Sequence, residues 1–172
     1  ILENRKDEIS PRMNGLIVDL YQDWIGLDER IGAITGEIEM IGKSEENCQR
    51  LMSVPGIGPI ISTAMVAAIG TGDAFGLVPR QYSTGGKTVL GRISKRGSKY
   101  LRTLFIQAAH VILMRPKNWE KFSFGPWLTE ASTRLHRNKL ATALANKLAR
   151  IAWSVLANQQ AFDTNKEEVT AI

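Results

Sequence analysis

The chain has 172 residues with 44% hydrophobic side chains, enough to bury the core of one domain or of a domain with an appendage. A single cysteine, Cys48, excludes an internal disulfide framework and fits a reducing cytoplasm, and two widely separated histidines give no structural zinc pattern. The longest apolar run, residues 60–69, is about half the roughly 20 residues that a membrane-spanning helix needs, so we expect no membrane partner.

Residues 13–41 predict a long helix that supercoils against a partner helix. After the first step, the apolar residues recur at spacings that alternate between three and four, namely at Met13, Ile17, Leu20, Trp24, Leu27, Ile31, Ile34, Ile38 and Ile41. Such a heptad seam is typical of a coiled coil. Ser10 followed by Pro11 supplies an N-cap and a first-turn proline. We therefore predict a coiled-coil arm over residues 1–44 that forms a homodimer or a tetramer, with a helical hairpin within one chain as the alternative.

Residues 48–70 predict two short apolar helices joined by a turn, an arrangement that resembles a helix-hairpin-helix. Pro59 stands where a first-turn proline would begin the second helix. In the turn, Gly56 and Gly58 would let the backbone approach a phosphate and point its N–H groups at it. Such contacts position a DNA duplex without reading its sequence. The alternative is an ordinary tight turn between packed helices.

The strongest local signal is the charge of residues 79–102. This stretch has no Asp or Glu, and its charged residues are all basic: Arg80, Lys87, Arg92, Lys95, Arg96, Lys99 and Arg102. The whole chain has a net charge of only +5, so positive charge is concentrated here. A local concentration of this kind is typical of a surface that binds a polyanion. We predict that these residues bind nucleic acid, with DNA as the main ligand.

The remaining patterns predict a mainly α fold, with the arm followed by a compact helical domain over residues 45–172. Residues 79–93 indicate an extended segment, a Ser-Thr-Gly-Gly turn and a short strand or irregular hairpin. Helices are predicted over residues 98–114 and 138–162, the second packing on the first. Four aromatic residues between them are interpreted as packing residues, with base stacking as the alternative: Trp119, Phe122, Phe124 and Trp127.

The start of the helix predicted at residues 98–114 breaks a local rule. Lys95, Arg96, Lys99 and Arg102 cluster over its first turns. A helix N-terminus carries partial positive charge and prefers acidic side chains. A bound polyanion would resolve this conflict, and a locally broken rule often marks a functional site.

Ser83 is the candidate nucleophile toward a phosphodiester. It stands on a glycine-containing turn, and Arg80, Arg92 and Arg96 could stabilise negative charge on the phosphoryl oxygens. The attack would leave a strand joined to the protein as a phosphoserine, which conserves bond energy for rejoining. The residues alone show no adjacent base, and a turn whose hydroxyl merely binds phosphate remains the alternative.

These blocks together resemble a known family. The segments LMSVPGIGPIISTAMVAAIG, GLVPRQYSTGGKTVLGRISKRGSKYLRTLFIQAA, PKNWE and LANKLARIAW resemble the C-terminal half of the DEDD-type insertion-sequence transposases, which include the Piv invertase and the bridge-RNA-guided recombinases. The resemblance covers residues 10–162. It implies a DNA-cutting and rejoining enzyme of the bacterial cytoplasm and nucleoid, with Ser83 as nucleophile and a structured guide RNA as a further partner.

The resemblance also implies parts that this chain lacks. In the family, an N-terminal RuvC-like domain holds Mg²⁺ through four acidic residues, so we expect no metal on this chain and no recombination by it alone. The chain begins with Ile rather than Met, which suggests a fragment. Relatives also carry an extra segment of the form GRDFAAWL between the positions of Phe75 and Gly76. The rival interpretation is a non-catalytic DNA- or RNA-binding and oligomerisation module.

Overall fold

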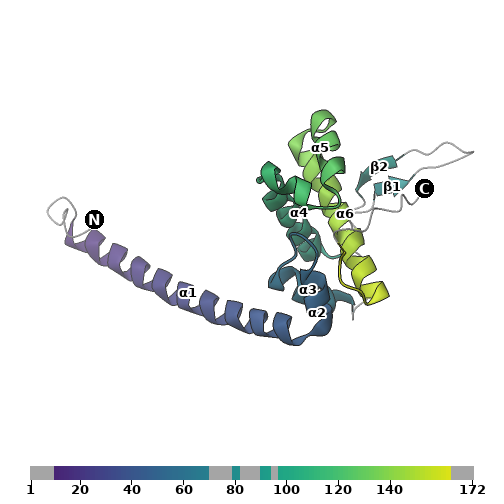
Figure 1. Cartoon of the computed structure of the whole chain (residues 1–172). Helices are drawn as coiled ribbons and strands as arrows, with labels where there is room; N and C mark the ends of the chain where they lie inside the picture. Colours follow the sequence, from purple (N-terminus) through teal and green to yellow (C-terminus); the bar gives the residue numbers. More distant parts are fainter. Residues whose placement is uncertain (1–9, 70–78, 82–89, 94–96, 164–172) are drawn as a thin grey trace, which may run out of the picture. The chain divides into compact units, whose positions relative to one another are not determined.

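The computed structural model describes residues 10–69, 79–81, 90–93 and 97–163, and most of them are helical (Figure 1). The prediction of a mainly α fold is therefore confirmed. The elements in chain order are α1 (Pro11–Ser44), α2 (Glu46–Met52), α3 (Pro59–Ile69), β1 (Pro79–Gln81), β2 (Leu90–Ile93), α4 (Lys99–Leu113), the 3-10 helix η2 (Pro116–Lys121), α5 (Gly125–Arg134) and α6 (Arg137–Asn158). The chain divides into two compact units, residues 1–40 and residues 41–172.

Helix α1 is a continuous helix of 34 residues that starts and ends where the sequence predicts. Its N-cap is Ser10, whose Oγ accepts a hydrogen bond from the backbone N–H of Met13 at 3.3 Å. This bond satisfies one of the N–H groups that the first helical turn leaves without a partner. The helix therefore begins at Pro11, the position that the sequence predicts for its first-turn proline.

The heptad seam of α1 is exposed in the single chain. Leu20, Trp24 and Ile31 are 68%, 62% and 60% exposed, values unusual for large apolar side chains that have a packing partner. Among the described residues of this first unit, the seam therefore has no core to pack into, unlike the apolar stripe of a helix in a globular domain.

The core of the second unit is built where α4 and α6 pack together. Phe105 and Leu101 of α4 and Leu144 and Leu148 of α6 are almost completely buried in one cluster. This packing was predicted from the apolar faces of the two helices and is confirmed. On the apolar face of α4, Leu104 is only partly buried, and the other residues are buried: Leu101, Phe105, Ala108, Ala109, Ile112 and Leu113.

The segment between α4 and α6 is fixed by a close backbone contact. A β-carbon at Gly125 would lie 2.1 Å from the carbonyl oxygen of Trp119, so only glycine fits at the start of α5. The indole Nε1–H of Trp119 donates to the carbonyl oxygen of Ile112 at 3.0 Å. Phe124 is fully buried and stacks on Phe122 with ring centroids 5.2 Å apart. Trp127 is also partly buried against the core, so the interpretation of these aromatics as packing residues is confirmed, although Trp119 keeps part of its surface exposed.

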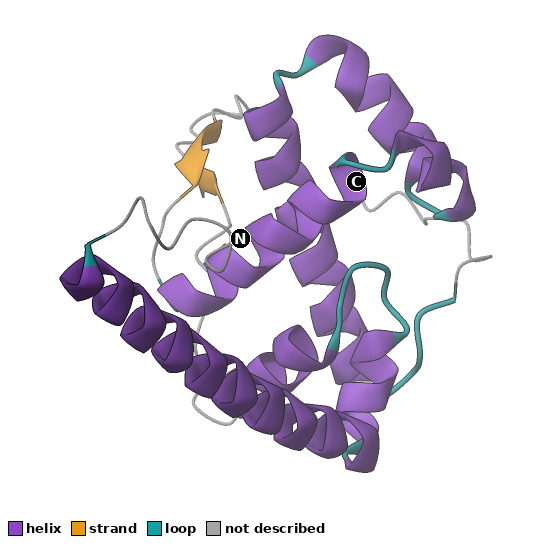
Figure 2. Ribbon diagram, turned by 90° about the vertical axis from the view of Figure 1, so that its left-hand side faces the viewer, coloured by secondary structure: helices purple, strands orange, loops and turns teal. Residues whose placement is uncertain are grey.

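The strands form one small antiparallel pair, drawn in orange in Figure 2. Pro79 pairs with Ile93 and Gln81 with Leu90, with a shift of register between the two pairs. The extended segment and short strand predicted at residues 79–93 are confirmed. The Ser83-Thr84-Gly85-Gly86 turn that would join them lies outside the described residues.

Candidate nucleic-acid interface

The basic start of α4 is the part of the predicted site that the structure describes in atomic detail. Gly97 has a φ of +90°, a conformation that favours glycine, and it leads the chain into the helix. Ser98 then caps α4, since its Oγ accepts from the backbone N–H of Leu101 at 3.3 Å. Lys99 is exposed in the first turn, which contains no acidic residue. The predicted conflict between basic side chains and the positive end of the helix dipole is therefore present at Lys99.

Arg102 lies in the same first turns and has an unsatisfied donor. Its Nη1 atom is buried and has no hydrogen-bond partner within the part of the chain that the structure describes. A buried donor without an acceptor costs free energy, about 1–3 kcal/mol and more for a charged group. Such a group needs an explanation, and an anion that binds at this helix start would supply the missing acceptor.

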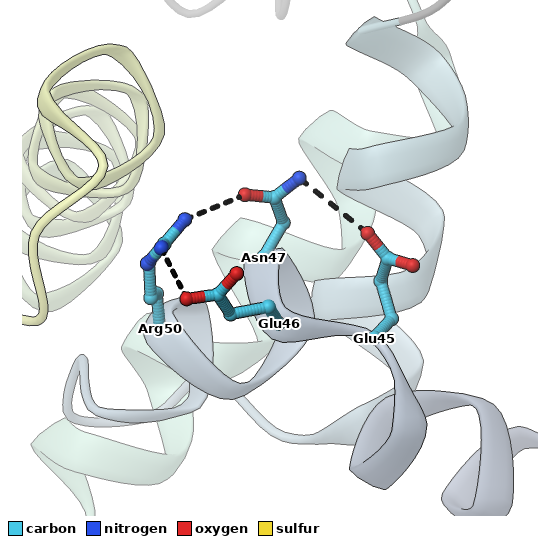
Figure 3. Close-up of polar contacts among 4 residues, drawn as sticks. All are labelled: Glu45, Glu46, Asn47 and Arg50. Atoms are coloured by element: carbon cyan, nitrogen blue, oxygen red, sulfur yellow. Dashed lines mark hydrogen bonds and ion pairs between the residues drawn. The ribbon is translucent and has the colours of Figure 1, made fainter.

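Arg50 shows how a satisfied arginine of this chain differs. Its guanidinium pairs with Glu46 one turn earlier and donates from Nη1 to Oδ1 of Asn47 at 3.2 Å (Figure 3). Asn47 in turn donates to Oε1 of Glu45 at 3.4 Å (Figure 3). These partners lie on the same short helix or at its start, whereas residues 74–119 contain no acidic residue to pair with Arg102.

Of the other predicted site residues, the structure describes two and leaves the rest outside its described ranges. Arg80 lies in β1 and Arg92 in β2, so the pairing of Pro79 with Ile93 brings their backbones onto neighbouring strands. The remaining predicted residues lie outside the described ranges: Ser83, Lys87, Lys95 and Arg96.

The predicted hairpin consists of α2, a tight turn and α3, and Pro59 is the first residue of α3 as expected. Gly56 has a φ of +84°, and a β-carbon there would lie 2.8 Å from Cδ1 of Ile112. The positive φ is the main requirement for glycine here, since Cδ1 at the end of the Ile112 side chain could shift to admit a β-carbon. Gly58 has open space where its β-carbon would be, so its backbone could be approached by a ligand.

The hairpin turn and the basic start of α4 do not form one cluster. The turn packs on Ile112, which is ten residues after Arg102 and so about 15 Å further along the helix axis. The turn and the basic helix start are close in the sequence, but they lie at different points along α4. Any nucleic acid that touches both would have to run along α4.

Two described features were not anticipated as parts of a site. The first is the unsatisfied Nη1 of Arg102. Its burial is set by the residues around the side chain in space, and the spacing of residues in the sequence does not show which these are. A cavity at the other end of α4 joins residues from four helices, and the only signal for it in the sequence was the aromatic and basic character of residues 115–139. Within the described residues, no group of three or more His, Cys, Asp or Glu could hold a metal ion.

Fold and site together define a mainly helical domain with a basic, carboxylate-free helix start and a long arm whose apolar seam is exposed. Among the helices that the structure describes, none has the length and apolar character needed to cross a membrane. Residues 48–123 match the family described as Transposase IS116/IS110/IS902 family. That segment includes the hairpin apart from the first two residues of α2, and all of β1, β2 and α4.

Two curated relatives extend the similarity over most of the chain. The transposase for insertion sequence element IS1328 of Yersinia enterocolitica is 40% identical over 165 residues, which is 90% of this chain and 49% of the relative. The transposase for insertion sequence element IS1111A of Coxiella burnetii is 38% identical over 173 residues, which is 94% of this chain and 47% of the relative. The chain thus spans about half the length of the curated relatives it matches.

Proposed function

We propose that this chain is the C-terminal half of an insertion-sequence transposase that cuts and rejoins DNA in the bacterial cytoplasm. The observation that carries the proposal is its similarity, over 90% or more of its length, to two proteins named as transposases. The basic start of α4, with an unsatisfied guanidinium nitrogen on Arg102, supports DNA as the ligand of this half.

In the proposed reaction Ser83 is the nucleophile. Its Oγ forms a bond to a backbone phosphorus of DNA as one P–O bond of that phosphodiester breaks; a general base takes the serine proton, and the departing oxygen takes up a proton. One strand end is then held as a phosphoserine and the other is released with a free hydroxyl. Because the number of phosphoester bonds is unchanged, the reverse attack by a strand hydroxyl can rejoin DNA without an energy source.

The basic residues would position the phosphate and stabilise the charge that develops on it. Arginine suits this role because its planar guanidinium donates two parallel hydrogen bonds to phosphate oxygens. Arg80 and Arg92 are held on paired strands beside the Ser83 turn in sequence, and Arg102 and Lys99 lie at the start of α4. A phosphate bound there would lie near the partly exposed Arg102 and against a helix N-terminus, which favours anions.

The proposal also includes a magnesium ion and an assembly of several copies of the chain. The described residues do not fit a magnesium site, since they contain no cluster of three metal-ligating side chains, so Mg²⁺ would be held outside them. The exposed seam of α1 would pair with the same seam of a second copy, giving a dimer or a tetramer. A structured guide RNA that selects the DNA sites would be a second ligand of the basic surface.

A covalent-adduct assay tests the proposal. The longest natural form of the protein is incubated with Mg²⁺, its guide RNA and nicked target DNA, and adducts are resolved on a denaturing gel beside Ser83→Ala and Thr84→Ala. We expect an adduct with the parent protein and with Thr84→Ala, and none with Ser83→Ala. Tight DNA binding without any adduct would instead favour the rival function, a non-catalytic nucleic-acid-binding and oligomerisation module.

A further inference from the structure

A cavity of about 430 Å³ opens at the C-terminal end of α4, the end opposite to its basic first turn. Its apolar walls include Leu113, Met114, Pro116 and Trp119, and its two polar lining residues are Ser132 and Arg137. These residues come from α4, η2, α5 and α6 or from the ends of these helices. The volume lies within the range of about 300–1,000 Å³ that is usual for pockets that bind small molecules.

The wall around Trp119 is preformed. The indole N–H of Trp119 is held by the carbonyl oxygen of Ile112 at 3.0 Å, which fixes the ring. The carbonyl oxygen of Trp119 is so close to Gly125 that no β-carbon fits between them. A ligand therefore would not have to order this wall when it binds, which lowers the entropic cost of binding.

The surroundings of the cavity are positively charged. Residues 115–139 contain two acidic residues, Glu120 and Glu130, and six basic ones: Arg115, Lys117, Lys121, Arg134, Arg137 and Lys139. Glu130 is already engaged by Arg134 at 3.8 Å. Arg137 lines the cavity and is exposed, and Arg115 and Lys117, which are also exposed, are next to the lining residue Pro116 in the sequence, so an anionic ligand would be favoured.

We propose that this cavity holds one unstacked nucleobase of a single-stranded nucleic acid, with Arg137 binding an adjoining phosphate. A base has two apolar faces that suit the apolar walls and a polar edge that needs a hydrogen-bonding group. Ser132 can serve that edge as an acceptor, because its hydroxyl proton is donated to the carbonyl oxygen of Thr129 at 2.7 Å. A base that is paired and stacked in a duplex could not enter.

This binding would be separate from strand transfer. Fourteen residues of α4 separate Lys99 from Leu113, about 21 Å along the helix, so the cavity is not part of the basic helix start. The proposal therefore stands whether or not Ser83 reacts with DNA.

The test uses a matched pair of carboxylates at the end of α4. Met114 lines the cavity and is 68% exposed, whereas Val111 is 52% exposed and does not line it. Both Met114→Glu and Val111→Glu add one negative charge near the same helix end at a site that tolerates a polar side chain. We expect Met114→Glu to weaken binding of a fluorescently labelled single-stranded oligonucleotide at least about fivefold more than Val111→Glu does. Equal losses for the two variants would overturn the proposal.

Two further measurements separate a base from other occupants. A strand of abasic sugar-phosphate units of the same length should bind more weakly than the base-containing strand, and Met114→Glu should weaken it no more than Val111→Glu does. Arg137→Gln should weaken single-strand binding, and Arg150→Gln, on the same helix but outside the cavity lining, should do so less. Equally tight binding of the abasic strand would overturn the proposal. So would a change of sedimentation caused by Met114→Glu alone, which would mark the cavity as a contact between copies of the chain.

Discussion

Gly56 in the α2–α3 turn packs directly on Ile112 in α4, because a β-carbon at Gly56 would lie only 2.8 Å from Cδ1 of Ile112. The φ of +84° at Gly56 is a second reason why another residue is strained there. We therefore expect Gly56→Ala to lower the free energy of unfolding by about 1–3 kcal/mol. Gly58→Ala is the control, since nothing lies within 4 Å of its β-carbon position. Urea denaturation measures both, and equal destabilisation would contradict this packing.

The exposed seam of α1 predicts self-association that a single charge can disrupt. Leu27 belongs to the seam, whereas Ile25 is equally part of α1 but lies off the seam. A lysine at a seam position must be buried against the partner helix, which is costly. We expect Leu27→Lys to dissociate the assembly and Ile25→Lys to leave it intact, as measured by analytical ultracentrifugation. A protein that is monomeric before substitution would refute the coiled coil.

The glycines of α1 should be replaceable with a gain in stability. Nothing lies within 4 Å of a β-carbon at Gly32 or Gly36, and neither belongs to the heptad seam. Each Gly→Ala change in a helix interior stabilises the helix by about 0.5–1 kcal/mol. We expect Gly32→Ala and Gly36→Ala to raise the helical circular dichroism of the arm and its melting temperature without changing the state of assembly. A loss of assembly would instead show that a partner helix packs closely on these glycines.

We expect Arg102 to lower the stability of the free protein and to raise its affinity for DNA. Replacing it with Met removes the buried, unbonded Nη1 while keeping much of the side-chain volume, so the free protein should be as stable as the parent or more stable. DNA affinity should fall, and the slope of log affinity against log salt should become shallower by about 0.9. Arg50→Met is the control, since that guanidinium is already bonded to Glu46 and Asn47. If both variants bind DNA like the parent, Arg102 does not contact phosphate.

The Cys48 thiol should make stability depend on pH at the alkaline end. Burial raises the pKa of this thiol above its ordinary value of 9.0, and the Glu45 carboxylate adds to the rise, although a hydrogen bond with Ser62 opposes it. The folded state therefore holds the proton more tightly than the unfolded state. The resulting stabilisation is complete below about pH 9 and is lost as the pH rises from there through the folded-state pKa.

A comparison with Cys48→Ala isolates this effect from other groups that titrate at high pH. The free energy of unfolding of the parent should fall more steeply above pH 9 than that of the variant. Because Cys48 is the only cysteine and is buried, a thiol reagent should also react much more slowly with the folded protein than with the unfolded one. Rapid reaction of the folded protein would show that this part of the core opens readily.

Residue spacing and capping side chains were sufficient to predict the elements that local sequence determines. The Ser10 cap, the start of α1 at Pro11 and the apolar face of α4 follow from hydrogen-bonding side chains and residue spacing, and each was confirmed. The end of the last helix was less predictable. It stops at Asn158 rather than continuing to Phe162, because Gln159 adopts a left-handed conformation that closes α6.

For the candidate site, too, some features could be predicted from the sequence and others could not. The sequence by itself determined that positive charge is concentrated in residues 79–102 and that α1 carries an apolar seam, because charge and spacing are properties of the chain. The three-dimensional packing was needed to show that Gly56 packs on Ile112, that Nη1 of Arg102 is buried without a partner among the described residues, and that Met114 and Arg137 line one cavity. These relationships depend on how α3, α4 and α6 pack together. Packing joins residues far apart in the sequence, and no local pattern records which ones will meet.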